Sequence, residues 1–197
     1  MKDKEEKIHP LLKIRQIFSM GYLPSRKDQT YQIVSQNGKT YGRQMNCLAH
    51  ACFNLTNELF DKLQFDDYDR YIFDAKQYPY EPEDHVVKNF IKKMQYCGLR
   101  VKKCKATTKT KTNEWKVALY FGSTAMLDKD YHFIIQESDG KWSSKVGWLS
   151  EVEYLKTPLK VYSTHGIDYK LYGIYIIENP ACNHLKFQPI EDDENDI

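Results

Sequence analysis

The chain has 197 residues, of which 41% are hydrophobic and 14% aromatic, and its formal net charge is +2. This length suits one domain with a hydrophobic core, and the nearly neutral charge does not require a nucleic-acid partner. The five cysteines form no CxxC pair, which argues against a structural zinc site. No phosphate loop or dinucleotide fingerprint is present, so we expect no cofactor.

The location of the protein is predicted from two further features. The first residues are charged and lack the apolar core of a secretory leader, and no apolar stretch is long enough to span a bilayer. We therefore expect a cytoplasmic protein with free thiols and no membrane partner.

The N-terminal region, residues 1–43, is predicted to contain one helix and one hairpin. Pro10 suits the first turn of a helix in which Leu11, Ile14 and Phe18 share a face, and Gly21 suits its end. Asn37 and Gly38 predict a tight turn between residues 31–34 and 40–41.

The next segment, residues 47–63, is predicted to be a helix that begins at Cys47. Its unpaired N–H groups and dipole would stabilise an anion, so they favour the thiolate form of this cysteine. The same residue also fits a small buried hydrophobe, as most free cysteines are. The buried stripe of this helix consists of Leu48, Cys52, Leu55, Leu59 and Leu63.

Beyond residue 63, a polar segment leads to a second helix and then to strands. Pro82 and Asp84 begin the helix and Gly98 ends it, with Val86, Val87, Phe90, Ile91 and Met94 facing inward. Strands are expected at residues 99–104, 116–121, 130–137, 141–146 and 172–178, and Asp139-Gly140 forms the turn between the third and the fourth. A capping-box pattern at residues 150–153 predicts a short helix after Trp148. Helices followed by strands predict an α+β fold with a mainly antiparallel sheet, and residues 181–197 form an acidic tail.

The histidine that best matches Cys47 is His132, which lies near the start of an apolar strand. A cysteine on a helix N-terminus followed by a histidine on a strand is the order found in papain-like cysteine hydrolases. A strand histidine that simply faces solvent is the alternative. His50 lies too close to Cys47 in sequence to define the fold-level pair.

Several short motifs resemble a family of small bacterial and phage proteins with a papain-like layout, similar to the NlpC-type peptidases. These motifs are Asn46-Cys47, Tyr131-His132-Phe133 and the block from Asp139 to Ser143 that contains Trp142, within residues 44–178. The resemblance implies a papain-like core over residues 44–180, with Cys47 as the nucleophile and His132 as the base.

The group that would orient His132 departs from the family pattern. In the family, Trp-Ser is commonly followed by histidine, whereas this chain has Ser144, which we predict to be a poor orienter of an imidazole. Asp139 sits in a turn, and Gln136 lies about 13 Å along the strand from His132. Gln44 or Asn46 is a candidate oxyanion donor, and ordinary turn chemistry is the alternative for both.

The sequence thus predicts a cysteine-dependent hydrolase or acyltransferase that acts on a peptide, amide or ester, or on a host protein. A basic segment supports a second hypothesis, in which a phage or mobile-element protein of RNA/DNA-binding or anti-CRISPR type acts on host nucleic-acid machinery. Lys102, Lys103 and Lys105 would then contact phosphates. A lysine-protected edge strand is the more common explanation of such a segment.

Overall fold

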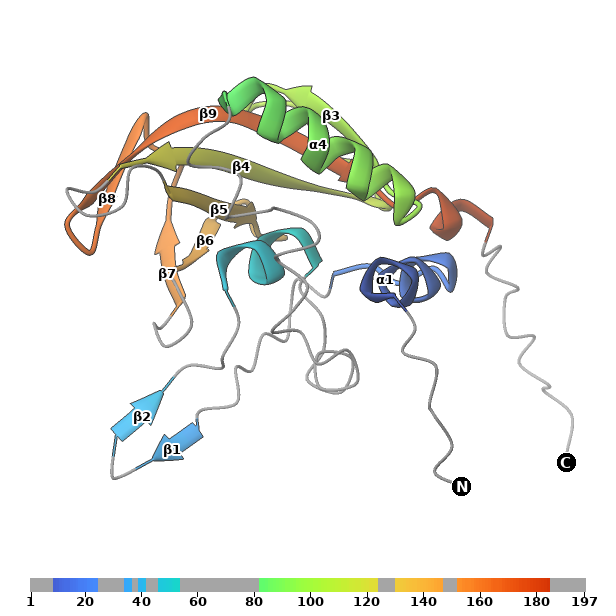
Figure 1. Cartoon of the computed structure of the whole chain (residues 1–197), viewed down its shortest axis with the longest axis horizontal. Coiled ribbons are helices and arrows are strands. Elements are labelled where there is room, and N and C mark those ends of the chain that lie inside the picture. The colour runs from blue at the N-terminus through green and yellow to red at the C-terminus, as the bar shows by residue number, and fades with distance from the viewer. Residues whose placement is uncertain are drawn as a thin grey trace, which may run out of the picture.

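The computed structural model describes residues 9–24, 34–36, 39–41, 46–53, 82–123, 130–146 and 152–184. Within these ranges the fold is α+β, with helices beside a strongly curved, seven-stranded sheet (Figure 1). The predicted fold class is confirmed at this level.

The first helix, α1 (Pro10–Ser19), has Pro10 in its first turn and ends before Gly21, whose φ is 80°. Ile14 and Phe18 are buried and Leu11 packs beside them, as their shared helical face predicts. The ring of Phe18 stacks on Trp115 at 6.0 Å, which joins this helix to the main core.

The predicted hairpin consists of β1 (Val34–Gln36) and β2 (Lys39–Tyr41), which pair in antiparallel register. Gln36 lies opposite Lys39, so residues 37–38 connect the strands. The turn residues themselves lie outside the described part of the chain.

The second predicted helix is α4 (Glu83–Tyr96), which is followed by Gly98 with a φ of 86°. Its inward face matches the apolar spacing, with Ile91 partly buried beside the core. The fully packed members of this face are Val86, Val87, Phe90 and Met94.

The large sheet is antiparallel throughout and has the order β3-β9-β4-β5-β6-β7, with β8 paired to β9. A short 3₁₀ helix, η3 (Pro180–His184), follows the last strand. The strands are β3 (Arg100–Cys104), β4 (Glu114–Gly122), β5 (Asp130–Gln136), β6 (Trp142–Lys145), β7 (Val152–Leu155), β8 (Val161–Thr164) and β9 (Ile167–Glu178).

The helix predicted after Trp148 is wrong, because residues 152–155 form strand β7. Val152 pairs with Lys145 and Leu155 pairs with Trp142 on β6, so the ladder of β6 decides the structure of this segment. Val and Tyr side chains also favour a strand over a helix. Strand β8 was not predicted either, and it meets β9 through a turn at His165 and Gly166, whose φ values are 50° and 75°.

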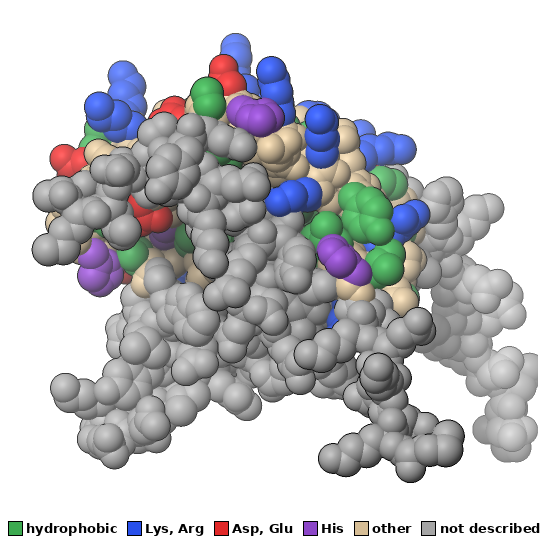
Figure 2. Space-filling view, in the orientation of Figure 1, with side chains coloured by type: hydrophobic (Ala, Val, Ile, Leu, Met, Phe, Trp, Pro, Cys, Tyr) green, Lys and Arg blue, Asp and Glu red, His purple; other side chains and the backbone are tan. Residues whose placement is uncertain are grey.

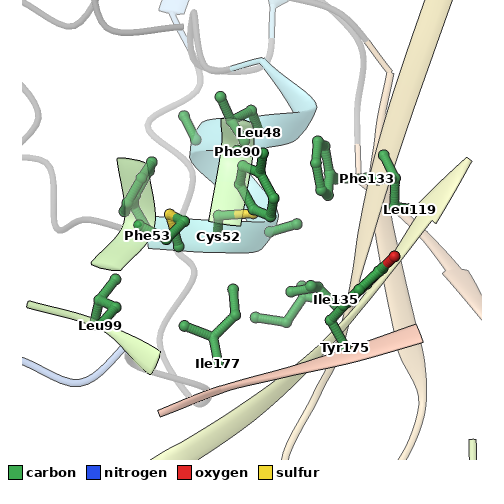
Figure 3. Close-up of a cluster of buried hydrophobic side chains, with 14 of the residues drawn as sticks. Leu48, Cys52, Phe53, Phe90, Leu99, Leu119, Phe133, Ile135, Tyr175 and Ile177 are labelled. Atoms are coloured by element: carbon green, nitrogen blue, oxygen red, sulfur yellow. The ribbon is translucent and has the colours of Figure 1, made fainter. Parts of the chain in front are cut away.

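Each face of the sheet has its own core. The first cluster contains Cys47, Leu48 and Cys52 together with α1, α4 and the odd-numbered residues 131–135 of β5 (Figure 3). The second cluster, on the other face, contains Ala118, Tyr120, Ile134, Trp142, Tyr162, Tyr169 and Ile174. Because side chains alternate along a strand, His132 shares the face of Ile134.

Asn179 connects the end of α1 to the end of the sheet. Its buried side-chain amide donates hydrogen bonds to the carbonyl oxygens of Phe18 at 2.9 Å and Tyr22 at 2.8 Å. Its backbone N–H donates to the carbonyl oxygen of Asn113 at 3.0 Å. The side chain therefore adds a second donor to the Phe18 carbonyl, which also accepts from the Gly21 N–H, and ties the segment after α1 to the end of β9.

The substitution Asn179→Ala should lower the free energy of unfolding by about 1–3 kcal/mol, because it removes two hydrogen bonds that a buried side chain donates to Phe18 and Tyr22. Urea unfolding followed by circular dichroism measures this change. Lys156→Ala, at an exposed position after β7, is the control and should change it by less than about 0.5 kcal/mol. Equal losses in the two variants would contradict this role of Asn179.

Candidate functional site

Cys47 is the first residue of a helical segment, as the sequence predicts. Asn46 caps that segment, because its Oδ1 atom accepts a hydrogen bond from the Ala49 N–H at 2.9 Å. Asn46 therefore has the ordinary capping role that was the alternative to an oxyanion donor. Gln44, the other candidate donor, lies outside the described residues.

The segment continues as a π-helix, η1 (Ala49–Phe53), in which all five residues are buried. The sequence pattern gave no sign of this wider turn, which is frequent at functional sites. Of the predicted stripe, Leu48 and Cys52 are buried, and Leu55, Leu59 and Leu63 lie outside the described residues.

The thiol of Cys47 lies against strand β5. Its side chain is 7% exposed, and Sγ is 4.0 Å from the carbonyl oxygen of Tyr131, the residue before His132. The segment η1 packs on both β5 and β6. The helix start and the histidine strand that the sequence singles out are thus neighbours in space.

A buried lysine is electrostatically coupled to this thiol. Lys145, on β6, is fully buried, and burial lowers the pKa of its ammonium group to about 8, whereas the charge of Cys47 acts in the opposite direction. At neutral pH the lysine is mostly protonated. Its positive charge therefore favours the thiolate of Cys47 over the thiol.

The ring of His132 is held on the second face of the sheet. It stacks on Tyr162, with centroids 5.4 Å apart and planes at 11°, and it contacts the ring of Tyr169 at 5.4 Å. Burial lowers the pKa of His132 to about 3, so the imidazole is neutral at pH 7. Its Nε2 atom lies 2.8 Å from Ser144 Oγ.

Cys47 belongs to the first cluster, whereas His132 faces the second. The thiol lies against the backbone of β5 beside His132, and the Nε2 atom of that histidine contacts Ser144. A proton exchanged with Cys47 would therefore use the other ring nitrogen, Nδ1. The catalytic pairing of Cys47 with His132 stays a prediction.

Ser144, at the position where the family pattern has histidine, lies within hydrogen-bond distance of His132, and its ability to orient the imidazole stays a prediction. Ser144 is itself linked to two further side chains. Its Oγ lies 3.0 Å from the Tyr162 hydroxyl, which donates a hydrogen bond to Glu153 Oε2 at 2.7 Å. Sequence reasoning missed Tyr162 and Glu153 because they lie on β8 and β7. The rejected alternatives make local contacts, since Gln136 donates to the Gly140 carbonyl and Asp139 pairs with Lys141.

A second histidine, His50, lies on the first face and is also buried. Its Nε2 atom lies 2.9 Å from Ser143 Oγ, which donates a short hydrogen bond to Glu137. Burial, and then the charge of Lys145, lower the pKa of His50 to about 3. This set of contacts attaches η1 to β6.

Of the lysines of the competing hypothesis, Lys102 and Lys103 lie on β3, an edge strand of the sheet, and Lys105 directly follows it. Figure 2 shows Lys and Arg side chains along the upper border of the molecule. Lys102, Lys103 and Lys105 are exposed. Lys102 pairs with Glu114 at 3.3 Å, and the Nζ atom of Lys103 lies 5.4 Å from the ring centroid of Tyr172.

In the part of the chain that the structure describes, no group of three or more His, Cys, Asp or Glu residues is arranged to hold a metal ion. None of the described helices has the length and apolar character needed to cross a bilayer.

The fold and this buried site define an α+β protein with a polar network on each face of its sheet. Residues 32–176 match the family described as "Domain of unknown function (DUF7689)", and the chain belongs to that family. Comparison with curated proteins and with solved structures gives no match.

The substitution Lys145→Met should raise the pKa of the Cys47 thiol, because it removes a buried positive charge while keeping most of the side-chain volume. A rise of one unit slows alkylation at pH 7 about tenfold. Limiting iodoacetamide followed by peptide mapping measures this rate, with Cys104 as the internal reference.

Lys141→Met is the matched control, since Lys141 is exposed and pairs with Asp139 at 3.2 Å. It should leave the Cys47 rate unchanged. A Cys47 rate that is equal in the Lys145→Met variant and the native protein would contradict the coupling.

Proposed function

We propose that this protein is a cytoplasmic, papain-like cysteine hydrolase or acyltransferase that acts on an amide or ester, with Cys47 as its nucleophile. One observation carries the proposal. Cys47 begins an Asn46-capped helical segment, and its Sγ lies 4.0 Å from the carbonyl oxygen of Tyr131, next to His132 on β5. The motifs shared with papain-like proteins support the same assignment.

In the proposed reaction, the Cys47 thiolate attacks the carbonyl carbon of the substrate and forms a tetrahedral oxyanion. Backbone N–H groups at the helix start stabilise that charge. His132 takes the thiol proton and delivers it to the leaving amine or alcohol as the carbon–heteroatom bond breaks. Water or an acceptor amine or alcohol then attacks the thioester and releases Cys47.

One electrostatic feature suits these roles, because Lys145 favours the thiolate before the attack. His132 is neutral at pH 7 and so has one unprotonated ring nitrogen, but burial, which lowers its pKa to about 3, makes it a weak base. The other described cysteines are less suited, because burial raises the pKa of Cys52, Cys97, Cys104 and Cys182.

Treatment with p-nitrophenyl acetate should place one acetyl group on Cys47 and release nitrophenolate in an initial burst. Intact-mass analysis and peptide mapping detect the thioester. Cys47→Ala should abolish both the burst and the acetylated peptide.

The matched controls are Cys104→Ala and Cys182→Ala, which remove the two partly exposed cysteines. Both variants should keep the burst. Acetylation confined to Cys104 or Cys182 in the native chain would rule out Cys47 as the activated thiol.

The second candidate function is binding of RNA or DNA along β3, and the exposure of Lys102, Lys103 and Lys105 supports it. The contacts of Lys102 with Glu114 and of Lys103 with Tyr172 reduce the charge that is available to phosphates. The observations therefore favour the hydrolase over this alternative.

If β3 binds nucleic acid, replacing Lys102, Lys103 and Lys105 together by alanine should weaken binding to all sequences. The magnitude of the slope of log K against log salt should decrease by about 2.7 on duplex DNA and by about 2.1 on single-stranded RNA if all three phosphate contacts are lost. Fluorescence anisotropy with labelled single-stranded RNA and duplex DNA measures the slope. Replacement of Lys88, Lys92 and Lys156 is the charge-matched control, and equal effects would exclude a site on β3.

A further inference from the structure

Four side chains on the second face form a hydrogen-bonded relay, and the donor and acceptor in each of its contacts follow from the number of protons that each group has. It runs from Glu153 through Tyr162 and Ser144 to His132, with distances of 2.7, 3.0 and 2.8 Å. We infer that this relay holds His132 in the Nε2–H tautomer, so that Nδ1 is the nitrogen that accepts a proton. The catalytic consequence rests on the proposed function, whereas the tautomer itself does not.

The direction is set at the Glu153 end. Glu153 is exposed, and a carboxylate only accepts hydrogen bonds. The Tyr162 hydroxyl therefore donates its single proton to Oε2 of Glu153. Burial raises the pKa of Tyr162 to about 12, so the phenol keeps this proton at neutral pH.

The remaining links follow from that donation. Because the proton of Tyr162 is used, its oxygen accepts from the Ser144 hydroxyl in the contact at 3.0 Å. Ser144 also has one proton, so its oxygen accepts in the contact with His132 Nε2. His132 therefore donates from Nε2.

The charge state of His132 completes the assignment. Burial lowers the pKa of the imidazole to about 3, so it is neutral at pH 7 and has only one N–H group. With that proton on Nε2, the lone pair is on Nδ1. The ring stacks on Tyr162 with Nε2 facing Ser144.

Ser144, Tyr162 and Glu153 are therefore positioning residues. They act on His132 by fixing which nitrogen carries its proton, as the orienting group of a catalytic triad does. The opposite tautomer would present an N–H group in place of the base and would be unable to take a proton from Cys47.

Nitrogen-15 NMR of the full chain at pH 7 tests the tautomer directly, because protonated and unprotonated ring nitrogens resonate far apart. The chain has six histidines, so the spectrum contains six sets of ring signals, and the set that is lost in His132→Gln belongs to His132. The native protein should show protonated Nε2 and unprotonated Nδ1. A native signal with protonated Nδ1 would overturn the inference.

The variant Tyr162→Phe removes the hydroxyl and keeps the stacked ring. Ser144 then has no Tyr162 oxygen to donate to and donates to His132 instead, so the proton should move from Nε2 toward Nδ1. Tyr120→Phe is the matched control, because the buried Tyr120 hydroxyl has no hydrogen-bond partner among the described residues. An unchanged tautomer in Tyr162→Phe, or an equal shift in both variants, would overturn the relay.

Ser144→Ala provides a second variant if Tyr162→Phe does not fold, and it should also give a mixture of tautomers. An unchanged Nε2–H signal in Ser144→Ala would overturn the inference. The acetylation experiment at Cys47 is separate. If Cys47 does not react but the native spectrum shows the Nε2–H tautomer that Tyr162→Phe shifts, the relay stands and the proposed hydrolase fails.

Discussion

Both polar networks depend on the register of β6, which places two adjacent serines on opposite faces of the sheet. Ser143 and Ser144 are adjacent, so their side chains point to opposite faces of the sheet. Ser143 contacts His50 of the segment that begins at Cys47, and Ser144 contacts His132 of β5. A shift of one residue in the pairing of β6 with β5 would exchange these faces and break both contacts.

His50 and His132 are neutral in the fold, and their burial makes the folded chain less stable in acid. Both have a pKa of about 3 in the fold against an ordinary value of 6.5, so the unfolded chain binds more protons between these values. The contribution of each site to stability is therefore fully present above pH 6.5 and decreases as the pH falls toward 3. The charge of Lys145 adds to the lowering of the His50 pKa, because it further disfavours protonation of that imidazole.

The sequence predicted the parts of the site that depend on local pattern. Pro10, Gly98 and the apolar spacing located both α-helices, and Asn46 preceding an apolar run located the start at Cys47. Strands β7 and β8 were missed because each has only four residues and half-exposed side chains, so tertiary pairing rather than periodicity defines them. Tyr162 and Glu153 were missed with them. The role of His50 depends on the π-helical turn, which no residue pattern indicated.

The position of Cys47 also depends on where β6 stops pairing with β5. Their register covers Ile134 to Gln136, whereas β5 begins at Asp130. The Tyr131 carbonyl that the thiol approaches lies in the part of β5 beyond this register. On its other side this part of β5 stays paired with β4, with Tyr131 opposite Phe121 and His132 opposite Tyr120. The site proposed for catalysis thus lies where the β5–β6 ladder ends, and the relay from Glu153 fixes the histidine at that place.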